Sequence, residues 1–195
     1  MLATGNVGKL TEMRAILAAH GLELIPQSDF GIAPPVEDGA SFGANALIKA
    51  RHAAAVSGLP AIADDSGLEV DALGGRPGLN SARYAGSGAT ARANNELLLS
   101  ELAGVAEEQR GARYRCAMVF VRDAADPGPI IAEGLWEGRI GREPRGKGGF
   151  GFDPLFIVGG DHRTAAELPA QEKNRQSHRG QALAALAARM RQCGW

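Results

Sequence analysis

The sequence predicts an α/β protein in which a mixed sheet is flanked by helices. Helical and strand-like segments alternate over the first half of the chain, as in strand–helix–strand crossover units. Two long strand-like segments, residues 112–123 and 128–141, then follow one another across a turn-forming stretch, which predicts an antiparallel pair beside those units. With 195 residues, of which 45% are hydrophobic and 22% charged, the chain fits a single domain over residues 1–195.

The first half opens with a short predicted strand at residues 1–4. Apolar residues at helical spacing then predict a helix that ends at Gly21, and residues 22–26 read as a second short strand. Ser41 is a predicted N-cap, and the alanine-rich run after it predicts a helix that Gly58 closes.

The second half again mixes strands and helices, and Ser177 is the predicted N-cap of the last helix. The predicted strands lie at residues 60–64, 68–73, 112–123, 128–141 and 153–158, and the predicted helices at residues 90–105 and 178–192.

The overall charge is nearly balanced. Lys and Arg number 21 against 22 for Asp and Glu, a formal net charge of −1, which argues against binding to nucleic acid or to an anionic membrane. The two cysteines form no CxxC pair, and Cys116 lies in a strand-like segment, so we expect a buried free thiol and a reducing compartment. No leader segment and no apolar run of membrane-spanning length is evident, so we expect a cytoplasmic protein.

Two adjacent acids, Asp64 and Asp65, end an apolar run that reads as a buried strand. Neighbouring carboxylates repel each other, and burying either without a partner is costly. We therefore expect positive groups from other segments to lie beside them.

The segment "TGNVGK" combines the end of a strand, a glycine-bearing turn and a helix start with a lysine. Such a turn presents backbone N–H groups and the positive end of a helix to an anion. A simple strand–helix connection would have the same composition. The candidate phosphate-binding residues are Thr4, Gly5, Asn6, Val7, Gly8 and Lys9.

Residues 141–154 form a glycine-rich loop that matches a Walker A motif only in part. Gly148 stands where that motif needs a Ser or Thr for Mg²⁺, and a strand rather than a helix follows, so we reject the motif. The loop also carries Phe150, Phe152 and Asp153. A long hairpin connection would explain the glycines, but two aromatic rings beside a carboxylate favour a surface on which a nucleobase stacks.

A polar stripe runs along the helix that follows Ser41. Asn45, Lys49 and His52 recur at helical spacing, and Glu37 lies just before the helix. A solvated helix face would explain this stripe equally well. The alternative is that Lys49 is carried inward towards the acids.

Three more basic residues, Lys173, His178 and Arg179, surround the N-terminus of the last predicted helix. Positive charge there opposes the helix dipole unless a ligand compensates, which is a modest sign of function. Carboxylates that hold Mg²⁺ and lysines that hold phosphate oxygens are what a metal–polyphosphate ligand needs. The residues that predict such a site are the acids Glu37, Asp64 and Asp65 and the lysines Lys9, Lys49 and Lys173.

The chain resembles the inosine triphosphate pyrophosphatase family, whose members hydrolyse non-standard purine nucleoside triphosphates such as ITP, dITP and XTP. The resemblance spans nearly the whole chain, and its most specific blocks are "ADDSGLEVDALGG" and "SHRGQAL". It implies an elongated α/β fold of two lobes with a nucleotide cleft between them, a homodimer, and dependence on Mg²⁺.

The resemblance also implies roles for individual residues. Asp65 would be the proton acceptor and a metal ligand, Glu37 the second metal ligand, and Ser66 a substrate contact. The phosphates would bind at residues 4–9. The residues expected around the purine are Phe150, Gly151, Phe152, Asp153, Lys173, His178 and Arg179.

We expect water to attack the α-phosphorus, releasing pyrophosphate and a nucleoside monophosphate. Donors from His178 and Arg179 would face the 6-oxo group of inosine or xanthosine and reject the 6-amino group of adenosine. Two alternatives are a non-catalytic nucleotide-binding regulator, which has little need for the acids, and a nucleic-acid-binding module, which the net charge disfavours.

Overall fold

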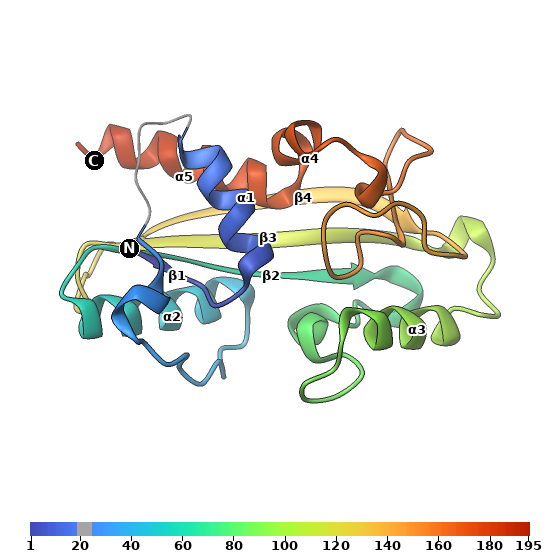
Figure 1. Ribbon diagram of the computed structural model, residues 1–195, viewed down its shortest axis with the longest axis horizontal. Coiled ribbons are helices and arrows are strands. Elements are labelled where there is room, and N and C mark those ends of the chain that lie inside the picture. The colour runs from blue at the N-terminus through green and yellow to red at the C-terminus, as the bar shows by residue number, and fades with distance from the viewer. Residues whose placement is uncertain (19–24) are drawn as a thin grey trace. The chain divides into compact units, whose positions relative to one another are not determined.

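The computed structural model describes residues 1–18 and 25–195 (Figure 1). Within them the chain forms a five-stranded sheet in the order β1-β2-β3-β4-β5. Its strands are β1 (Leu2–Ala3), β2 (Ala61–Val70), β3 (Gly111–Val121), β4 (Ile130–Ile140) and β5 (Phe156–Val158). β1 pairs with β2 in parallel and β4 pairs with β5 in antiparallel fashion, so the predicted mixed sheet is confirmed.

The chain divides into two compact units. Unit 1 comprises Met1–Asp65, Cys116–Gly134 and His178–Trp195, and unit 2 comprises Ser66–Arg115 and Leu135–Ser177. Strands β2, β3 and β4 each contribute residues to both units.

Unit 1 contains helices α1 (Val7–Ala18), α2 (Phe42–Ser57) and α5 (His178–Gln192). Ser41 caps α2 by accepting a hydrogen bond from the Ala44 N–H at 3.1 Å, and Gly58 ends it in the left-handed conformation at φ +69°, as predicted. Helices α1 and α5 lie side by side (Figure 1).

The strands of unit 1 bury both faces. Leu2 and Ile62 belong to the apolar cluster that α1 and α5 complete, whereas Ala61 and Ala63 belong to the cluster completed by α2. Successive strand residues point to opposite faces, so α1 and α5 cover one face and α2 covers the other. The second cluster consists largely of alanines, whose small side chains let α2 approach the strands closely.

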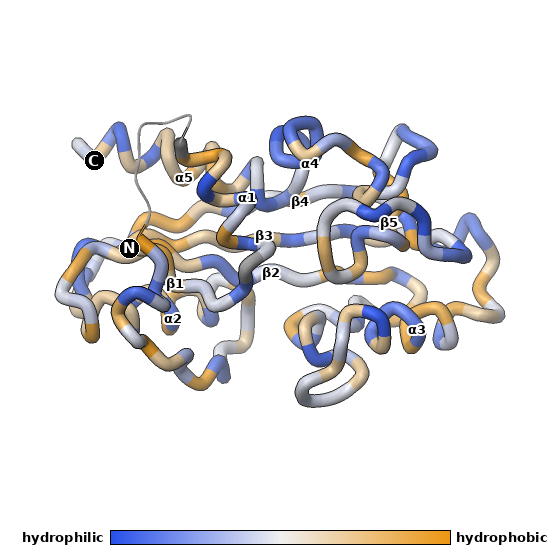
Figure 2. The backbone as a smooth tube through the Cα atoms, in the orientation of Figure 1, coloured by the Kyte–Doolittle hydropathy of each residue, from blue (hydrophilic) through white to orange (hydrophobic). Residues whose placement is uncertain are grey.

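Unit 2 contains helices α3 (Ala91–Glu101) and α4 (Ala170–Gln176). Thr90 caps α3 through a 3.1 Å hydrogen bond from the Ala93 N–H. The colours of hydrophobic and hydrophilic residues alternate along α3 in Figure 2, as expected for a helix with one buried side. Aromatic rings fill the core of this unit, with the Tyr114 and Phe156 centroids 4.7 Å apart.

Several predicted boundaries need correction. The strands predicted at residues 60–64 and 68–73 are one strand, β2, which runs through both acids and ends in a 3₁₀ turn at Asp71–Leu73. The helix predicted at 90–105 ends at Glu101, and the strand predicted at 153–158 begins only at Phe156. Helix α4 was not predicted. The predicted helix end at Gly21 and residues 22–24 of the second predicted strand lie outside the described residues.

Other predictions hold. The last helix has the predicted bounds, residues 178–192, and it directly follows Ser177. Cys116 is a buried free thiol, and burial raises its pKa to about 12. In the described part of the chain, no helix combines the length and the apolarity needed to span a bilayer.

Candidate active site

Asp64 and Asp65 lie next to each other on β2 but have different partners. Asp64 shares its strand face with Ile62, and Asp65 shares the opposite face with Ala63. Asp64 therefore faces α1 and α5, and Asp65 faces α2. The strand alternation keeps the two carboxylates apart, and each one has its own cation.

Asp64 is fully buried and bound by two cations. Its Oδ2 lies 2.9 Å from Lys9 Nζ on α1 and 3.6 Å from Arg179 Nε on α5. Burial alone would favour the protonated acid, but Lys9 and Arg179 lower the pKa of Asp64 well below its ordinary value. Asp64 is thus a permanent anion that holds Lys9 in place.

Arg179 is also buried, and a second carboxylate binds it. Its Nη1 donates to Glu12 Oε2 at 2.6 Å. Burial opposes the charge, but Asp64, Cys116 and Glu12 raise the pKa of the guanidinium. Glu12 was not predicted from the sequence, although it follows Lys9 at i+3 on α1, a spacing that puts both residues on one helix face.

Asp65 is bound by two residues of α2. Lys49 Nζ donates to its Oδ1 at 3.0 Å, and Asn45 Nδ2 donates to its Oδ2 at 3.2 Å. These contacts show that Asn45 and Lys49 do not belong to a purely solvated stripe on α2. His52 is different, because its Nε2 lies 2.9 Å from the Ala33 carbonyl oxygen.

Glu37 reaches the same lysine. Lys49 Nζ donates to Glu37 Oε2 at 3.1 Å, so one ammonium group bridges Glu37 and Asp65. Burial would lower the pKa of Lys49, but Asp64, Asp65 and Glu37 raise it above its ordinary value.

The donor set at this point suits Mg²⁺. The carboxylates of Glu37 and Asp65 converge on the ammonium group of Lys49. Mg²⁺ is commonly held by one or two carboxylates together with water and substrate phosphates. Among residues 1–18 and 25–195, no group of three or more His, Cys, Asp or Glu side chains is arranged to hold a metal ion. If Glu37 and Asp65 hold Mg²⁺, its remaining ligands would come from water or a bound phosphate.

The segment "TGNVGK" forms the predicted strand–turn–helix. Asn6 caps α1, because its Oδ1 accepts a hydrogen bond from the Lys9 N–H at 3.1 Å, and Thr4 Oγ1 accepts from the Asn6 N–H at 3.2 Å. Gly5 and Asn6 are exposed. An exposed turn at the start of a helix retains the geometry expected of an anion-binding segment.

In unit 2 the candidate residues gather around Asp153. Lys173 Nζ donates to its Oδ2 at 2.6 Å, the Phe150 N–H donates to the same oxygen at 2.8 Å, and Tyr114 Oη donates to Oδ1 at 3.2 Å. A Cβ added at Gly149, where φ is +68°, would lie 2.1 Å from that Oδ2. Asp153 thus anchors the glycine-rich loop, a role that the sequence analysis did not anticipate.

The predicted pair of stacking rings is divided. Phe152 is only 4% exposed, lies in the core of unit 2 and contacts Tyr84 edge-on at 6.4 Å between centroids. Phe150 is half-buried, and Lys173 Nζ lies 5.1 Å from the centre of its ring. The prediction that both rings form one flat surface is therefore wrong, because Phe152 is buried in the apolar core of this unit.

In unit 1 the structure thus brings together Glu37, Lys49 and Asp65, and on the other face of β2 it pairs Lys9 with Asp64. In unit 2 it brings together Phe150, Asp153 and Lys173. His178 is buried at the start of α5, Ser66 is half-buried directly after Asp65, and the Gly151 carbonyl accepts a hydrogen bond from Asn95 Nδ2 at 3.1 Å.

The chain is similar to known proteins over nearly its whole length. The model of the Ham1 family matches residues 1–189. The chain is 60% identical over 191 residues to a dITP/XTP pyrophosphatase from Methylococcus capsulatus, covering 98% of this chain and 95% of that protein. It is 51% identical over 191 residues to a dITP/XTP pyrophosphatase from Escherichia coli, covering 98% and 97%.

Solved structures are similar as well. A HAM1 protein from Coxiella burnetii superimposes with a TM-score of 0.89 at 47% identity, covering 98% of this chain and 97% of that one. A nucleoside-triphosphatase / dITP/XTP pyrophosphatase from Mycobacterium abscessus superimposes with a TM-score of 0.75 at 45% identity, covering 95% of each chain.

Proposed function

Because this chain belongs to the Ham1 family, we propose that it hydrolyses the non-standard purine nucleotides dITP, ITP, XTP and dXTP to the monophosphate and pyrophosphate. Such an activity removes damaged purines from the nucleotide pool. The predicted resemblance to inosine triphosphate pyrophosphatases is confirmed by the relatives named dITP/XTP pyrophosphatase. The observation that best supports the proposal is that Glu37 and Asp65 share the ammonium group of Lys49, while the neighbouring Asp64 forms a buried ion pair with Lys9.

Glu37 and Asp65 would hold Mg²⁺, which when bound neutralises phosphate charge and orients the phosphate oxygens. The carboxylate of Asp65 accepts a proton from the water that attacks the α-phosphorus. The ammonium groups of Lys9 and Lys49 offset the negative charge that develops as pyrophosphate leaves. Asp64 holds Lys9 through a 2.9 Å ion pair, which accounts for a second acid beside the first.

For the purine, Phe150 is the proposed stacking side chain, with Lys173 and Asp153 fixing the loop that carries it. His178 and Arg179 remain the proposed donors to a 6-oxo group. The homodimer and the cytoplasmic location expected from the sequence also remain proposals. A non-catalytic nucleotide-binding regulator is not favoured, because the relatives described above are named as pyrophosphatases.

The products made from dITP test the proposed function. In water enriched in ¹⁸O with Mg²⁺ present, we expect dIMP that carries one ¹⁸O atom and pyrophosphate that carries none, because water attacks the α-phosphorus. Mass spectrometry of both products measures which of them carries the ¹⁸O label. Label in pyrophosphate would place the attack on the β-phosphorus, and dIDP with orthophosphate as first products would refute the proposed reaction.

With dATP in place of dITP we expect kcat/KM to be lower by ~10³-fold, because the proposed hydrogen-bond donors of His178 and Arg179 would face the 6-amino group of adenine, which is itself a donor.

The proposed metal site has a neighbouring control residue. Glu37→Gln is expected to raise the Mg²⁺ concentration that gives half-maximal dITP turnover by ~10-fold, because one of two anionic oxygen ligands becomes neutral. The matched control is Asp38→Asn, which removes the same charge from the adjacent exposed residue. Titrations of turnover against Mg²⁺ compare the two variants. Equal shifts would mean that only the general negative potential matters and that Glu37 is no ligand.

A further inference from the structure

We propose that unit 2 carries a second anion-binding site, which takes a small molecule bearing a phosphate group. The site is a groove of about 470 Å³, within the usual size range of ligand pockets. Its ionisable lining residues are Glu107, Arg139, Arg142, Glu143, Arg145 and His162. We call it the basic groove, and it shares no residue with the candidate active site.

Arginines outnumber acids in the lining of the basic groove, with Arg139, Arg142 and Arg145 against Glu107 and Glu143. Arg139 pairs with Glu107 at 2.6 Å, which neutralises both. Arg142 is exposed, and no ion pair or hydrogen bond joins its guanidinium to any residue in the described part of the chain. An arginine stays charged at neutral pH, so Arg142 brings an uncompensated positive charge to the groove.

A second positive charge lies beneath the groove wall. Arg110 is 2% exposed and donates from Nε to the Ile140 carbonyl and from Nη2 to the Gly141 carbonyl, both at 2.8 Å. Its Nη1 donates to the Leu102 carbonyl at 2.7 Å. No carboxylate within the described residues forms an ion pair with it. Arg110 binds the carbonyl of Gly141, the residue directly before Arg142, and burial and Arg142 lower the pKa of Arg110 whereas Glu107 raises it.

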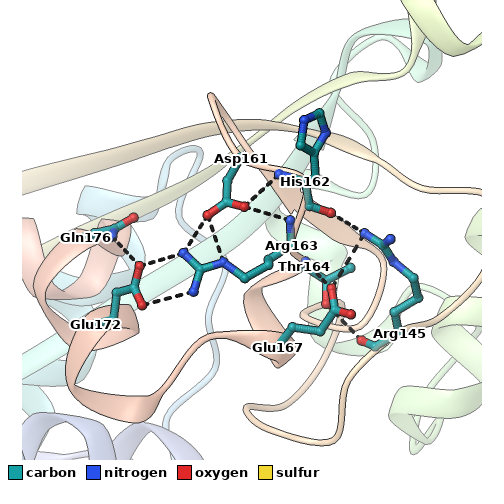
Figure 3. A network of polar contacts seen from close by, with 8 residues as sticks. All are labelled: Arg145, Asp161, His162, Arg163, Thr164, Glu167, Glu172 and Gln176. Carbon is teal, nitrogen blue, oxygen red and sulfur yellow. Dashed lines mark hydrogen bonds and ion pairs between the residues drawn. The ribbon is translucent and has the colours of Figure 1, made fainter.

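Arg145 is held in position at the edge of the groove (Figure 3). Its Nη2 donates to the His162 carbonyl and lies 3.5 Å from Glu167 Oε2, while the Thr164 hydroxyl donates to the Arg145 carbonyl at 2.8 Å. Figure 3 shows the imidazole of His162 pointing away from this network. An arginine whose rotamer is already fixed loses less entropy when it binds an anion.

These features point to one class of ligand. Arg110 and Arg142 have no carboxylate ion-pair partner within the described residues, and the lining arginines outnumber Glu107 and Glu143, so the groove attracts an anion. Guanidinium groups match phosphate oxygens best because they can donate two parallel hydrogen bonds. Ile157, which is 7% exposed, also lines the groove and offers apolar contact to an uncharged part of a ligand. A free inorganic oxyanion and an organic phosphate share this chemistry.

The test uses the full ¹⁵N-labelled chain without Mg²⁺, titrated separately with inorganic pyrophosphate and with inosine monophosphate. NMR follows the Arg142 guanidinium and His162 imidazole signals. Arg142→Glu is compared with Arg92→Glu, an exposed arginine of α3 that pairs only loosely with Glu96 at 3.6 Å. We expect saturable shifts in the wild type and in Arg92→Glu, and affinity weakened by ~10-fold or more in Arg142→Glu. Turnover of dITP should be unchanged in both variants.

The two ligands separate the possible sources. Saturation by pyrophosphate means that an inorganic oxyanion suffices. Saturation by inosine monophosphate alone identifies an organic phosphate as the ligand. Either result supports the site. The proposal is overturned if neither ligand gives a saturable shift. It is equally overturned if both charge reversals weaken binding to the same extent, which would show general attraction rather than a site.

Discussion

Replacing Asp65 by asparagine is expected to lower kcat for dITP by at least ~10²-fold while the protein still folds. The substitution removes the proposed proton acceptor and one proposed metal ligand together. It also places a neutral amide against Lys49, whose ammonium group then keeps Glu37 as its one ion-pair partner among residues 1–18 and 25–195. The measurement is steady-state turnover at saturating Mg²⁺, with circular dichroism as the check on folding.

The control is Asp71→Asn, an exposed acid of unit 2 that pairs with Arg113. It is expected to leave kcat within about twofold of wild type, because surface pairs contribute little. Near-normal turnover in Asp65→Asn would mean that another group activates the water. No gain in stability is expected from Asp65→Asn, since Asp64 and Asp65 lie on opposite strand faces and each has its own cation.

Replacing Asp64 by alanine is expected to lower the free energy of unfolding by about 3–5 kcal/mol, the usual cost of removing one partner from a buried ion pair. Asp64 is the anion nearest to Lys9, and it also compensates the buried guanidinium of Arg179. After its removal, Arg179 still pairs with Glu12 at 2.6 Å. Urea denaturation with an unchanged m-value measures the loss.

The double variant Asp64→Ala/Arg179→Met should lose less than the sum of the two single losses, because removing both charges leaves no uncompensated ion. Asp71→Ala is the surface control, and it is expected to cost less than about 1 kcal/mol. A loss below about 1 kcal/mol in Asp64→Ala would show that Glu12 alone compensates Arg179.

The sequence by itself determined the types of most elements and several of their ends. Ser41 and Gly58 act within a single turn of their own helix, so neighbouring residues suffice to identify them. The turn at residues 4–9 is equally local. The sequence also identified the long strands β3 and β4, which follow one another across a turn-forming stretch.

Only the tertiary structure decided which cation meets which acid. Strand alternation requires Asp64 and Asp65 to point apart, but the helices packed on each face determine that Lys9 and Arg179 reach one and Lys49 the other. These partners also explain why β2 runs through the acids as one strand instead of breaking there.

The packing of distant segments also accounts for other features that the sequence analysis did not predict. Phe152 packs into a core that is assembled from segments far apart in the chain, and Asp153, the partner of Lys173, lies twenty residues before it in the sequence. The imbalance of charge in the basic groove likewise arises only where β4, the loop after it and Arg110 meet. Contacts between distant segments depend on how helices and strands pack, and no local pattern of residues specifies that packing.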